Sequence, residues 1–388
     1  MTSYSVEDPF GLAADLGSEE QLIASTVRDW VRRRFLPIVA DAWRAGGLPS
    51  ELGPELGELG LLGMHLQGYG CAGTSATAYG LACLELEAGD SGLRSFVSVQ
   101  GSLAMFAIHA FGSEAQKERW LPPMAAGEVI GCFGLTEPDA GSDPAAMRTR
   151  ARRDGEQWVL NGTKMWITNG GRAGVAVVWA KTDEGIRGFL VPAGTDGFST
   201  VDVKDKLSLV ASTTSELILE DCRLDADAVL PEVNSLRGPL SCLSEARYGI
   251  VWGSVGAARA CLEAALEYTA SRIAFGRPIA ARQIVQQELV EMHVAVNNGL
   301  LLATRIGHLK DAGLVTSEHI SYGKFNNVRM ATDVARRARA LLGANGITLE
   351  YPVMRHLVNL ESVLTYEGTH QIHALVLGKA LTGHAAFE

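Results

Sequence analysis

The stretch Tyr366–His373 (YEGTHQIH) places one carboxylate and two imidazoles together in an apolar region, which we expect to be a helix over Pro352–Leu381. A carboxylate removed from water has a raised pKa and is a stronger base, so Glu367 is a candidate for proton abstraction. An ordinary solvated helix glutamate explains the residues equally well. The spacing of His370 and His373 also suits a metal, but no third ligand accompanies them, so we predict no metal site.

A single arginine, Arg94, interrupts the mostly apolar run Ser91–Val99. A guanidinium group in such a run must reach solvent or find a carboxylate. Glu87 lies seven residues earlier, two helical turns away on the same helix face. One interpretation is an internal Glu87–Arg94 ion pair. The other is that Arg94 receives a carboxylate of a ligand in a bidentate contact.

Two loops combine glycines with polar side chains. Residues 134–144 (GLTEPDAGSDP) could present backbone N–H groups and hydroxyls to a phosphate or a heterocycle, although a solvated acidic turn has the same composition. Residues 68–73 match G-x-G-x-x-G, and Asp90 lies about 20 residues further on, as in a dinucleotide fingerprint. That fingerprint needs a preceding strand inside a βαβ unit, and the pattern here predicts none.

Three consecutive parts of the chain must position these residues, and their order predicts an α+β fold. We expect an N-terminal α-helical domain over residues 1–128, a central β-sandwich or barrel over 129–235 and a C-terminal four-helix bundle over 236–388. The bundle is predicted from four long runs that are apolar at the helical period. These runs are Leu240–Ala270, Ala280–Asp311, Ser317–Leu342 and Pro352–Leu381.

The central part has short β-rich runs separated by turn residues. Trp158–Leu160 leads into Asn161-Gly162, which is the strongest short hairpin signal. Met165–Thr168 then leads into Asn169-Gly170-Gly171. Because turns are frequent and no long helix intervenes, we expect an antiparallel sheet.

Composition limits the classes of function. The chain has 388 residues, of which 47% are hydrophobic, and a formal net charge of −10. This charge disfavours sequence-independent nucleic-acid binding and anionic membrane surfaces. No apolar run approaches the roughly 18 residues of a membrane span. The six cysteines are scattered with no C-x-x-C, and the N-terminal residues are polar and acidic, so we expect reduced thiols and a cytoplasmic protein.

Taken together, the chain resembles the acyl-CoA dehydrogenase family of flavoenzymes, and within it the glutaryl-CoA dehydrogenase subgroup. The resemblance runs from the Asp8-Pro9-Phe10 region to Leu381-Thr382-Gly383. The stretches that carry it include Cys132–Pro144, Leu160–Asn169 and Thr365–His370, with Asp90–Ser95. The family fold has a helical domain, a central β domain and a four-helix bundle, in the order predicted above.

The resemblance implies a catalytic role for Glu367, which matches the base that removes the α-proton of the acyl thioester. Its backbone amide, with the ribityl 2′-hydroxyl of the flavin, would hold the thioester oxygen as enolate charge develops. In the glutaryl subgroup Arg94 would hold the substrate carboxylate, and Glu87 would orient Arg94. The implied substrate-binding residues are Arg94, Ser95, Ser98, Glu87, Tyr366, Arg247 and Gly368.

The resemblance also implies FAD as cofactor. Trp166 matches the aromatic side chain that packs on the isoalloxazine, and Thr168 matches the hydroxyl near N5. Arg272 and Phe275 match positions that reach the FAD of a neighbouring subunit. The implied cofactor-binding residues are Leu135, Thr136, Ser142, Trp166, Thr168, Arg272, Phe275, Thr369 and Gln371.

The implied reaction is FAD-dependent α,β-dehydrogenation of an acyl-CoA substrate. In the glutaryl subgroup this becomes oxidative decarboxylation of glutaryl-CoA to crotonyl-CoA and CO2. Electrons would pass to an electron-transfer flavoprotein, and the family resemblance implies a homotetramer.

Several positions depart from the subgroup. Leu93 replaces a usual tyrosine and Val210 a usual arginine, so an alternative is a dehydrogenase of another carboxylated or polar acyl thioester, bound to CoA or a carrier protein, without decarboxylation. Ala340 and Ala344 replace residues that serve the partner's FAD. Ala246 stands where some members place an alternative base. A non-enzymatic interaction protein with the same fold is a distant alternative, against which the presence of Glu367, Trp166 and Thr168 argues.

Overall fold

The structure is a computed structural model that describes residues 5–386. Its elements confirm the predicted α, β, α order along the chain. By contacts the described residues form two compact units, of which unit 1 comprises residues 5–41, 75–94 and 247–386, and unit 2 comprises residues 42–74 and 95–246. The division falls within three helices, α3 (Val39–Ala45), α6 (Ser91–Ser98) and α9 (Arg237–Ser271). The domain boundaries at 128/129 and 235/236 stay a prediction.

In the described residues, unit 1 has helices and one two-stranded hairpin, β8 (Ile273–Ala274) with β9 (Arg277–Pro278). Its α-helices, besides those at the division, are α1 (Leu12–Asp15), α2 (Ser18–Trp30), α5 (Ala76–Gly89), α10 (Gln283–Asp311), α11 (Ser317–Leu341), α12 (Pro352–Thr365) and α13 (His370–Thr382). Shorter helical turns are η1 (Val31–Phe35), η2 (Leu36–Ile38), η7 (Ile279–Ala281) and η8 (Gly343–Ile347).

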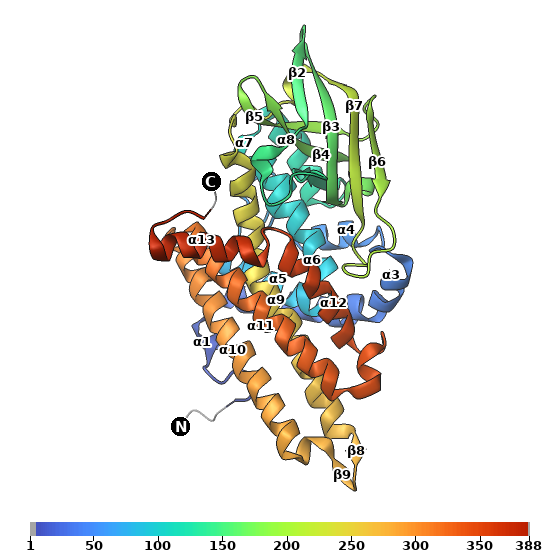
Figure 1. Ribbon diagram of the computed structural model, residues 1–388, viewed down its shortest axis with the longest axis vertical. Coiled ribbons are helices and arrows are strands. Elements are labelled where there is room, and N and C mark those ends of the chain that lie inside the picture. The colour runs from blue at the N-terminus through green and yellow to red at the C-terminus, as the bar shows by residue number, and fades with distance from the viewer. Residues whose placement is uncertain (1–4, 387–388) are drawn as a thin grey trace. The chain divides into compact units, whose positions relative to one another are not determined.

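The long helices of unit 1 pack through apolar faces and a few buried polar side chains. Figure 1 shows α10, α11 and α12 side by side, and Met292 of α10 is fully buried. Asn327 of α11 donates from Nδ2 to the carbonyl oxygens of Val251 (2.9 Å) and Gly299 (3.1 Å), so one buried amide joins three helices. Hydrogen-bonded polar groups of this kind fix one arrangement of a bundle whose apolar faces alone would allow several.

The prediction of one helix over Pro352–Leu381 was wrong. The helix is broken after Thr365 and restarts at His370. The reason is local, because Glu367 and Gly368 both have left-handed backbones, with φ of 55° and 86°. Periodicity did not predict the break because the apolar positions continue on both sides of it.

Unit 2 contains a seven-stranded sheet in the order β1-β4-β2-β3-β7-β6, with β5 paired to β4. Its strands are β1 (Gly131–Gly134), β2 (Arg150–Asp154), β3 (Gln157–Thr168), β4 (Val175–Thr182), β5 (Gly185–Pro192), β6 (Phe198–Asp202) and β7 (Thr214–Leu224). The helical elements are α4 (Leu52–Glu58), η3 (Val99–Met105), α7 (Phe106–Phe111), α8 (Glu114–Ala125), η4 (Pro144–Ala146), η5 (Gly170–Arg172) and η6 (Ala226–Ala228). The sheet is mostly antiparallel, as predicted, but β1 and β2 pair with β4 in parallel.

The predicted hairpin turn at Asn161-Gly162 was also wrong, because β3 continues through both residues. The pairing of β3 with β7 shifts register between Leu160 and Gly162, which marks a β-bulge. Asn161 and Asp221 exchange two hydrogen bonds across this bulge. Pairing with a distant strand therefore overrides the local turn preference.

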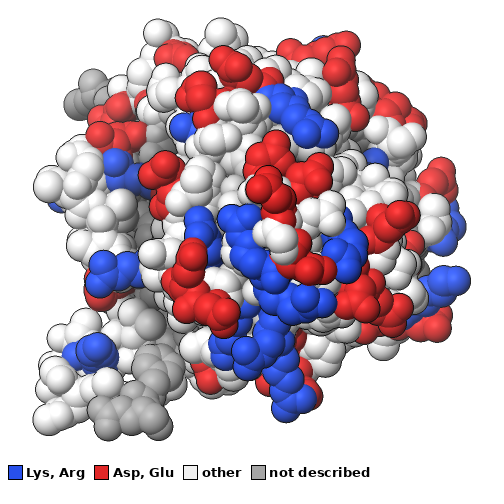
Figure 2. All heavy atoms as spheres, turned by 90° about the horizontal axis from the view of Figure 1, so that it is seen from above, with Lys and Arg blue, Asp and Glu red and all other residues white. Residues whose placement is uncertain are grey.

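Charged side chains of both signs are mixed on the surface. Figure 2 shows one face, on which a central group of Lys and Arg side chains is bordered by Asp and Glu side chains. Within residues 5–386, no helix is long and apolar enough to cross a membrane. None of the six cysteines, all within residues 5–386, is in a disulfide, and five of them are buried.

Candidate active site

The break between α12 and α13 removes Glu367 from any helix face. The residue sits in a left-handed conformation that a side chain with a Cβ rarely adopts. Thr369 then caps α13, since its hydroxyl accepts a hydrogen bond from the Ile372 amide at 3.2 Å. Strained backbone of this kind persists only where its surroundings hold it, and it gathers at functional sites. We call residues 366–368 the Glu367 segment.

Two basic side chains hold the three consecutive carbonyl groups of the Glu367 segment. Lys324 Nζ donates to Tyr366 O and, at 2.6 Å, to Gly368 O. Arg247 Nε donates to Glu367 O at 2.7 Å. These carbonyls follow the C-terminus of α12, where peptide dipoles favour cations. The backbone is thus fixed by charged donors while the Glu367 side chain is left for other contacts.

One oxygen of the Glu367 carboxyl group, Oε2, lies near three cationic side chains without a hydrogen bond to any of them. This atom is buried and accepts no hydrogen bond from the described residues. Burial raises the pKa of Glu367, and the positive charges of Arg247, Lys324 and Arg94 oppose that rise. A carboxylate with a raised pKa and an unengaged oxygen is suited to accept a proton.

The expected ion pair between Glu87 and Arg94 is present. Both side chains are buried, and Arg94 Nε donates to Glu87 Oε2 at 2.7 Å. Burial acts against the charged form of Arg94, but the Glu87 carboxylate outweighs it and raises the pKa of Arg94. The guanidinium also donates to Tyr366 Oη, which links it to the Glu367 segment. Gly253 of α9 allows this packing, because a Cβ there would lie 2.0 Å from Glu87 Oε2.

The serines predicted beside Arg94 are buried on the same helix, α6. Ser95 and Ser98 each expose 2% of their surface. They follow Arg94 by one and four residues, and the division between the units falls between Arg94 and Ser95. Leu93, at the position where the subgroup has a hydroxyl, is fully buried and apolar.

In unit 2, the predicted binding residues Leu135, Thr136 and Ser142 belong to a loop that we call the Leu135 loop, residues 134–144. The backbone of Thr136 is tied to β3, because Met165 N donates to Thr136 O at 2.8 Å. Lys164 Nζ donates to Leu135 O at 3.1 Å. The Ser142 side chain is exposed. The loop is therefore held through its backbone at one end and open to a ligand at the other.

A buried ion pair that we did not predict supports the Leu135 loop. Lys164 Nζ lies 2.8 Å from Glu137 Oε1, and Glu137 also accepts the backbone N–H groups of Arg148 and Thr149. Burial would raise the pKa of Glu137, but these donors together hold it at about 2. Burial lowers the pKa of Lys164 to about 8. The sequence signal that could have predicted this ion pair is Lys164, a basic residue at an inward-facing position of a β-rich run.

Trp166 and Thr168 occupy the end of β3. Trp166 has a left-handed backbone, with φ of 63°, next to a register shift between Lys164 and Ile167. The bulge turns the indole outward, and 58% of the Trp166 surface is exposed. Thr168 is half-buried. An aromatic ring presented in this way is available to stack on a planar ligand.

Arg272 and Phe275 lie just after α9, at the β8–β9 hairpin of unit 1. Phe275 also has positive φ (52°), and 96% of its surface is exposed. The Arg282 side chain donates to Phe275 O and lies over its ring at 5.9 Å. Arg272 and Gln371 are exposed. Trp166, Phe275 and Glu367 thus share an unfavourable backbone conformation, which sequence reasoning did not predict for any of them.

Two alternative interpretations lose their support in the structure. Residues 5–67 contain no strand, and Asp90 accepts hydrogen bonds from Arg355 and Asn359 inside unit 1, so the glycine pattern is not a dinucleotide fingerprint. His370 stacks on Phe325 at 4.0 Å, and His373 is buried. Among residues 5–386, no group of three or more His, Cys, Asp and Glu side chains could hold a metal ion.

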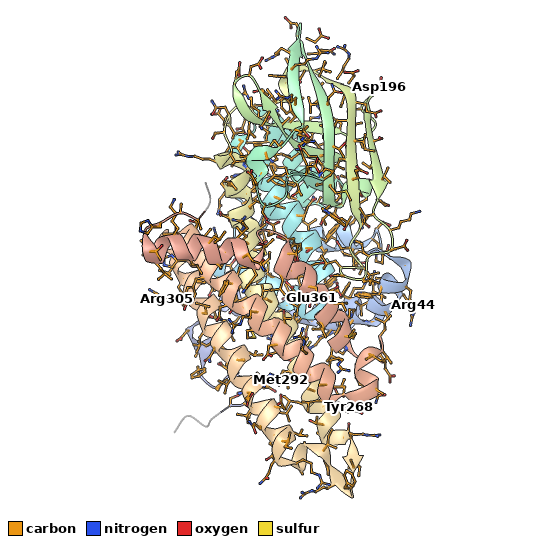
Figure 3. All side chains as sticks on the ribbon, viewed as in Figure 1. Arg44, Asp196, Tyr268, Met292, Arg305 and Glu361 are labelled. Carbon is orange, nitrogen blue, oxygen red and sulfur yellow. The ribbon has the colours of Figure 1, made fainter. Side chains whose placement is uncertain are left out.

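Elsewhere in unit 1, Tyr268, which is labelled in Figure 3, is one of the residues that line a cavity of about 460 Å³. Its basic side chains are already paired, since Arg28 and Arg259 both contact the buried Glu85, at 2.8 Å and 2.5 Å. None of the predicted substrate-binding residues lines it. We therefore assign the chemistry to the Glu367 segment rather than to this cavity.

Comparison with known protein families agrees with the geometry. The models of the acyl-CoA dehydrogenase N-terminal, middle and C-terminal domains match residues 17–128, 132–222 and 237–382. The chain belongs to the acyl-CoA dehydrogenase family. Human mitochondrial short-chain specific acyl-CoA dehydrogenase is 36% identical over 372 residues, covering 94% of this chain and 90% of that protein.

Two solved structures are similar over their whole length. The crystal structure of glutaryl-CoA dehydrogenase from Mycobacterium smegmatis is 62% identical, with a TM-score of 0.97 and full coverage of both chains. A glutaryl-CoA dehydrogenase from the same organism in complex with FADH2 is 59% identical, with a TM-score of 0.98 and full coverage. The acyl-CoA dehydrogenase fold of this chain is therefore established in all three of its parts.

Proposed function

We propose that the chain is an FAD-dependent dehydrogenase that converts glutaryl-CoA to crotonyl-CoA and CO2. The observation that carries this proposal is the Glu367 carboxyl group, buried and without a hydrogen bond at Oε2, next to the buried Glu87–Arg94–Tyr366 arrangement. One group suits proton removal and the other suits recognition of a carboxylate. The two similar glutaryl-CoA dehydrogenases support this choice of substrate.

The residues of this chain fit FAD as cofactor. Trp166 is exposed on a strained backbone and would stack on the flavin, while Leu135, Thr136, Ser142 and Thr168 would offer backbone and hydroxyl groups. Thr369 and Gln371 would contact it after the base, and Arg272 and Phe275 would reach the FAD of a neighbouring subunit. The flavin, when bound, supplies the acceptor for the hydride that leaves the β-carbon.

Glu367 removes the proton from the α-carbon of the thioester. The electron pair of that C–H bond moves toward the thioester carbonyl, and the β-hydrogen leaves with its electron pair as hydride. The Glu367 backbone N–H would donate to the thioester oxygen, where negative charge develops. Because one residue supplies both the carboxylate and the amide, their spacing is fixed by the backbone.

Arg94 holds the distal carboxylate of the substrate, with Ser95 and Ser98 beside it on α6 and Glu87 orienting the guanidinium. Arg247 lies near the CoA moiety, and Gly368 allows close approach of the thioester. After oxidation, the bond between the γ-carbon and the carboxylate breaks and CO2 leaves. The electron pair of the broken bond stays on the organic fragment and forms a dienolate. The protonated Glu367 then gives its proton to this dienolate, which yields crotonyl-CoA.

The remaining features of the proposal concern the setting of the enzyme. An electron-transfer flavoprotein would reoxidise the flavin, as the family resemblance implies. The family resemblance also implies a homotetramer, and the 96% exposed Phe275 is a side chain that a neighbouring subunit would cover. A cytoplasmic location is supported by six cysteines that form no disulfide.

The test is anaerobic incubation of the purified yellow protein with glutaryl-CoA, followed by addition of a flavin-reoxidising acceptor. We expect the flavin absorbance to bleach and CO2 and crotonyl-CoA to form in equal amounts. Absence of bleaching with any acyl-CoA would defeat the dehydrogenase assignment.

A second candidate function is a dehydrogenase of another carboxylated or polar thioester that does not decarboxylate. The buried, apolar Leu93 next to Arg94 favours it, because the acyl pocket gains no hydroxyl there. Accumulation of glutaconyl-CoA without CO2, or faster turnover of another donor in a panel of CoA and carrier-protein thioesters, would select this candidate.

A further inference from the structure

Lys324 has an unusual position for a lysine in the middle of a long helix. It lies on α11, exposes only 2% of its surface, and donates to the two carbonyl oxygens that flank Glu367. The apolar side chains of Val328 and Val363 line the same small gap in the packing as Lys324. A buried ammonium is unfavourable unless its charge is used, so the contact with the Glu367 segment accounts for its presence.

The contact between Lys324 Nζ and Tyr366 O acts on the reaction through one peptide group. Tyr366 O and Glu367 N–H belong to the same peptide group, and a cationic donor on the oxygen polarises that group. The N–H therefore becomes a stronger donor toward the thioester oxygen. The second contact, at Gly368 O, keeps the left-handed Glu367–Gly368 backbone in place.

The charge around Lys324 is tied to the ionisation of Glu367. Burial lowers the pKa of Lys324 well below its usual value, the Glu367 carboxylate opposes this, and Arg247 and Arg94 add to it. The titratable groups facing Glu367 are therefore Arg247 from α9, Lys324 from α11, Arg94 from α6, and Tyr366 and His373 from its own end of the chain.

We propose that Lys324 is a positioning residue for enolate formation, because its ammonium polarises the Tyr366–Glu367 peptide that binds the thioester oxygen and fixes the backbone that aims the Glu367 carboxylate. This inference rests on the proposed dehydrogenase function. Lys324 touches no reacting atom. It transfers no proton in the reaction, in which the α-proton moves from substrate to Glu367.

The test compares Lys324→Met with the wild-type enzyme and with Lys379→Met, which removes an exposed lysine of α13. We expect Lys324→Met to slow flavin bleaching by glutaryl-CoA about 10²-fold at saturation, as for loss of an oxyanion donor, with less than about threefold change in substrate affinity. The deuterium isotope effect at the α-carbon should rise, because proton removal becomes more limiting. The acid limb of kcat/KM should move to higher pH, since a cation near Glu367 is removed.

A second measurement does not depend on turnover. Acetoacetyl-CoA ionises to an enolate without being oxidised, and its absorbance reports the pH at which the bound thioester loses its proton. We expect Lys324→Met to raise that pH by about one unit or more, and Lys379→Met to leave it unchanged. Lys324→Gln, which keeps a neutral N–H donor group but no charge, should fall between Lys324→Met and wild type.

The outcomes distinguish failure of the inference about Lys324 from failure of the proposed dehydrogenase function. If no acyl-CoA bleaches the wild-type flavin, the proposed function fails. If the wild type is bleached and Lys324→Met shows the same rate, isotope effect and enolate pH, this inference fails while the function stands. If both Lys324→Met and Lys324→Gln fail to fold or to retain flavin, Lys324 serves folding alone and the inference is overturned.

Discussion

Two buried lysines hold backbone carbonyl groups beside the predicted binding residues, one in each unit. Lys164 donates to Leu135 O in unit 2, and Lys324 donates to Tyr366 O and Gly368 O in unit 1. Lys164 also has a carboxylate partner, Glu137, whose remaining lone pairs are satisfied by backbone N–H groups. Lys324 forms no ion pair at hydrogen-bond distance with any carboxylate of residues 5–386, and the carboxylate whose charge raises its pKa is that of Glu367.

This difference in partners gives the two lysines different roles, because Lys164 stabilises the fold and Lys324 influences the reaction. A buried lysine paired with its own carboxylate forms a neutral, closed network, which is strongly destabilised only when one partner is removed. A buried lysine that shares its electrostatic environment with an unengaged carboxylate changes that carboxylate's proton affinity. We therefore expect substitutions around Lys164 to alter stability, and substitutions around Lys324 and Glu367 to alter the reaction.

The largest expected effect is a loss of turnover on substitution of Glu367, the carboxylate close to Lys324. Glu367→Gln keeps the size of the side chain but removes the base, so turnover with glutaryl-CoA should fall by about 10²–10⁴-fold. Yellow flavin and substrate binding should remain, because the backbone contacts of Lys324 and Arg247 do not involve the carboxylate. Stopped-flow bleaching and substrate titration measure the two quantities.

The matched control is Glu361→Gln, which changes an exposed glutamate of α12 (Figure 3) and should leave turnover unchanged. Normal turnover in Glu367→Gln would remove the base assignment and, with it, the distinction between the two lysines.

The next largest effect concerns the stability that the buried Glu137–Lys164 ion pair provides. Glu137→Gln leaves the buried Lys164 ammonium without its carboxylate, and unfolding free energy should fall by about 3 kcal/mol at pH 7. The pKa of Glu137 is lowered from 4.5 to about 2, so its ionised form contributes fully above pH 4.5, and this contribution is lost as pH falls toward 2. The difference from wild type should therefore shrink on acidification, as denaturant unfolding measures.

The double variant Glu137→Gln with Lys164→Met removes both members of the ion pair. It should be more stable than Glu137→Gln alone, because no uncompensated charge stays buried. A shift of the acid limb of kcat/KM in either variant, equal to that of Lys324→Met, would contradict the division into a structural and a chemical lysine.

A third effect concerns recognition, which belongs to the same unit as Glu367. Arg94→Gln removes the charged donor, so kcat/KM for glutaryl-CoA should fall about 10²-fold, while that for butyryl-CoA changes less than about threefold. Because Glu87 is left buried without its partner, Glu87→Gln combined with Arg94→Gln is the control for stability. An equal loss for both substrates would show that Arg94 serves the fold and not the carboxylate.

The sequence predicted the elements better than the contacts that hold the site. Long apolar periodicity placed the starts and ends of α9, α10 and α11 within a few residues, because a core-facing helix repeats one simple pattern. Glu367 and the Glu87–Arg94 pair were identified because a charge in an apolar run needs an explanation. The break at Glu367 was missed, since it depends on cations that lie 120 and 43 positions away in the chain, at Arg247 and Lys324.

The two lysines themselves were missed for a physical reason. A lysine in a helix or a strand predicts a solvated side chain, and only tertiary packing shows that its ammonium group is surrounded by carbonyls. The bulges at Gly162 and Trp166 were missed because a register shift depends on the partner strand β7. Such contacts are non-local, so residue spacing carries little trace of them.

The smallest expected effect compares one helix cap in each unit. Thr369 caps α13 directly after the Glu367 segment. Ser113 caps α8 in unit 2, where its hydroxyl accepts a hydrogen bond from the backbone N–H of Gln116 at 3.3 Å. Alanine at either position should lower the unfolding free energy by about 1 kcal/mol. Only Thr369→Ala should also reduce kcat, by a few-fold, because it loosens the backbone that aims Glu367. Equal Tm shifts with unequal kcat would place the difference in the Glu367 segment, whereas a similar loss of kcat in Ser113→Ala would mean that general destabilisation explains both.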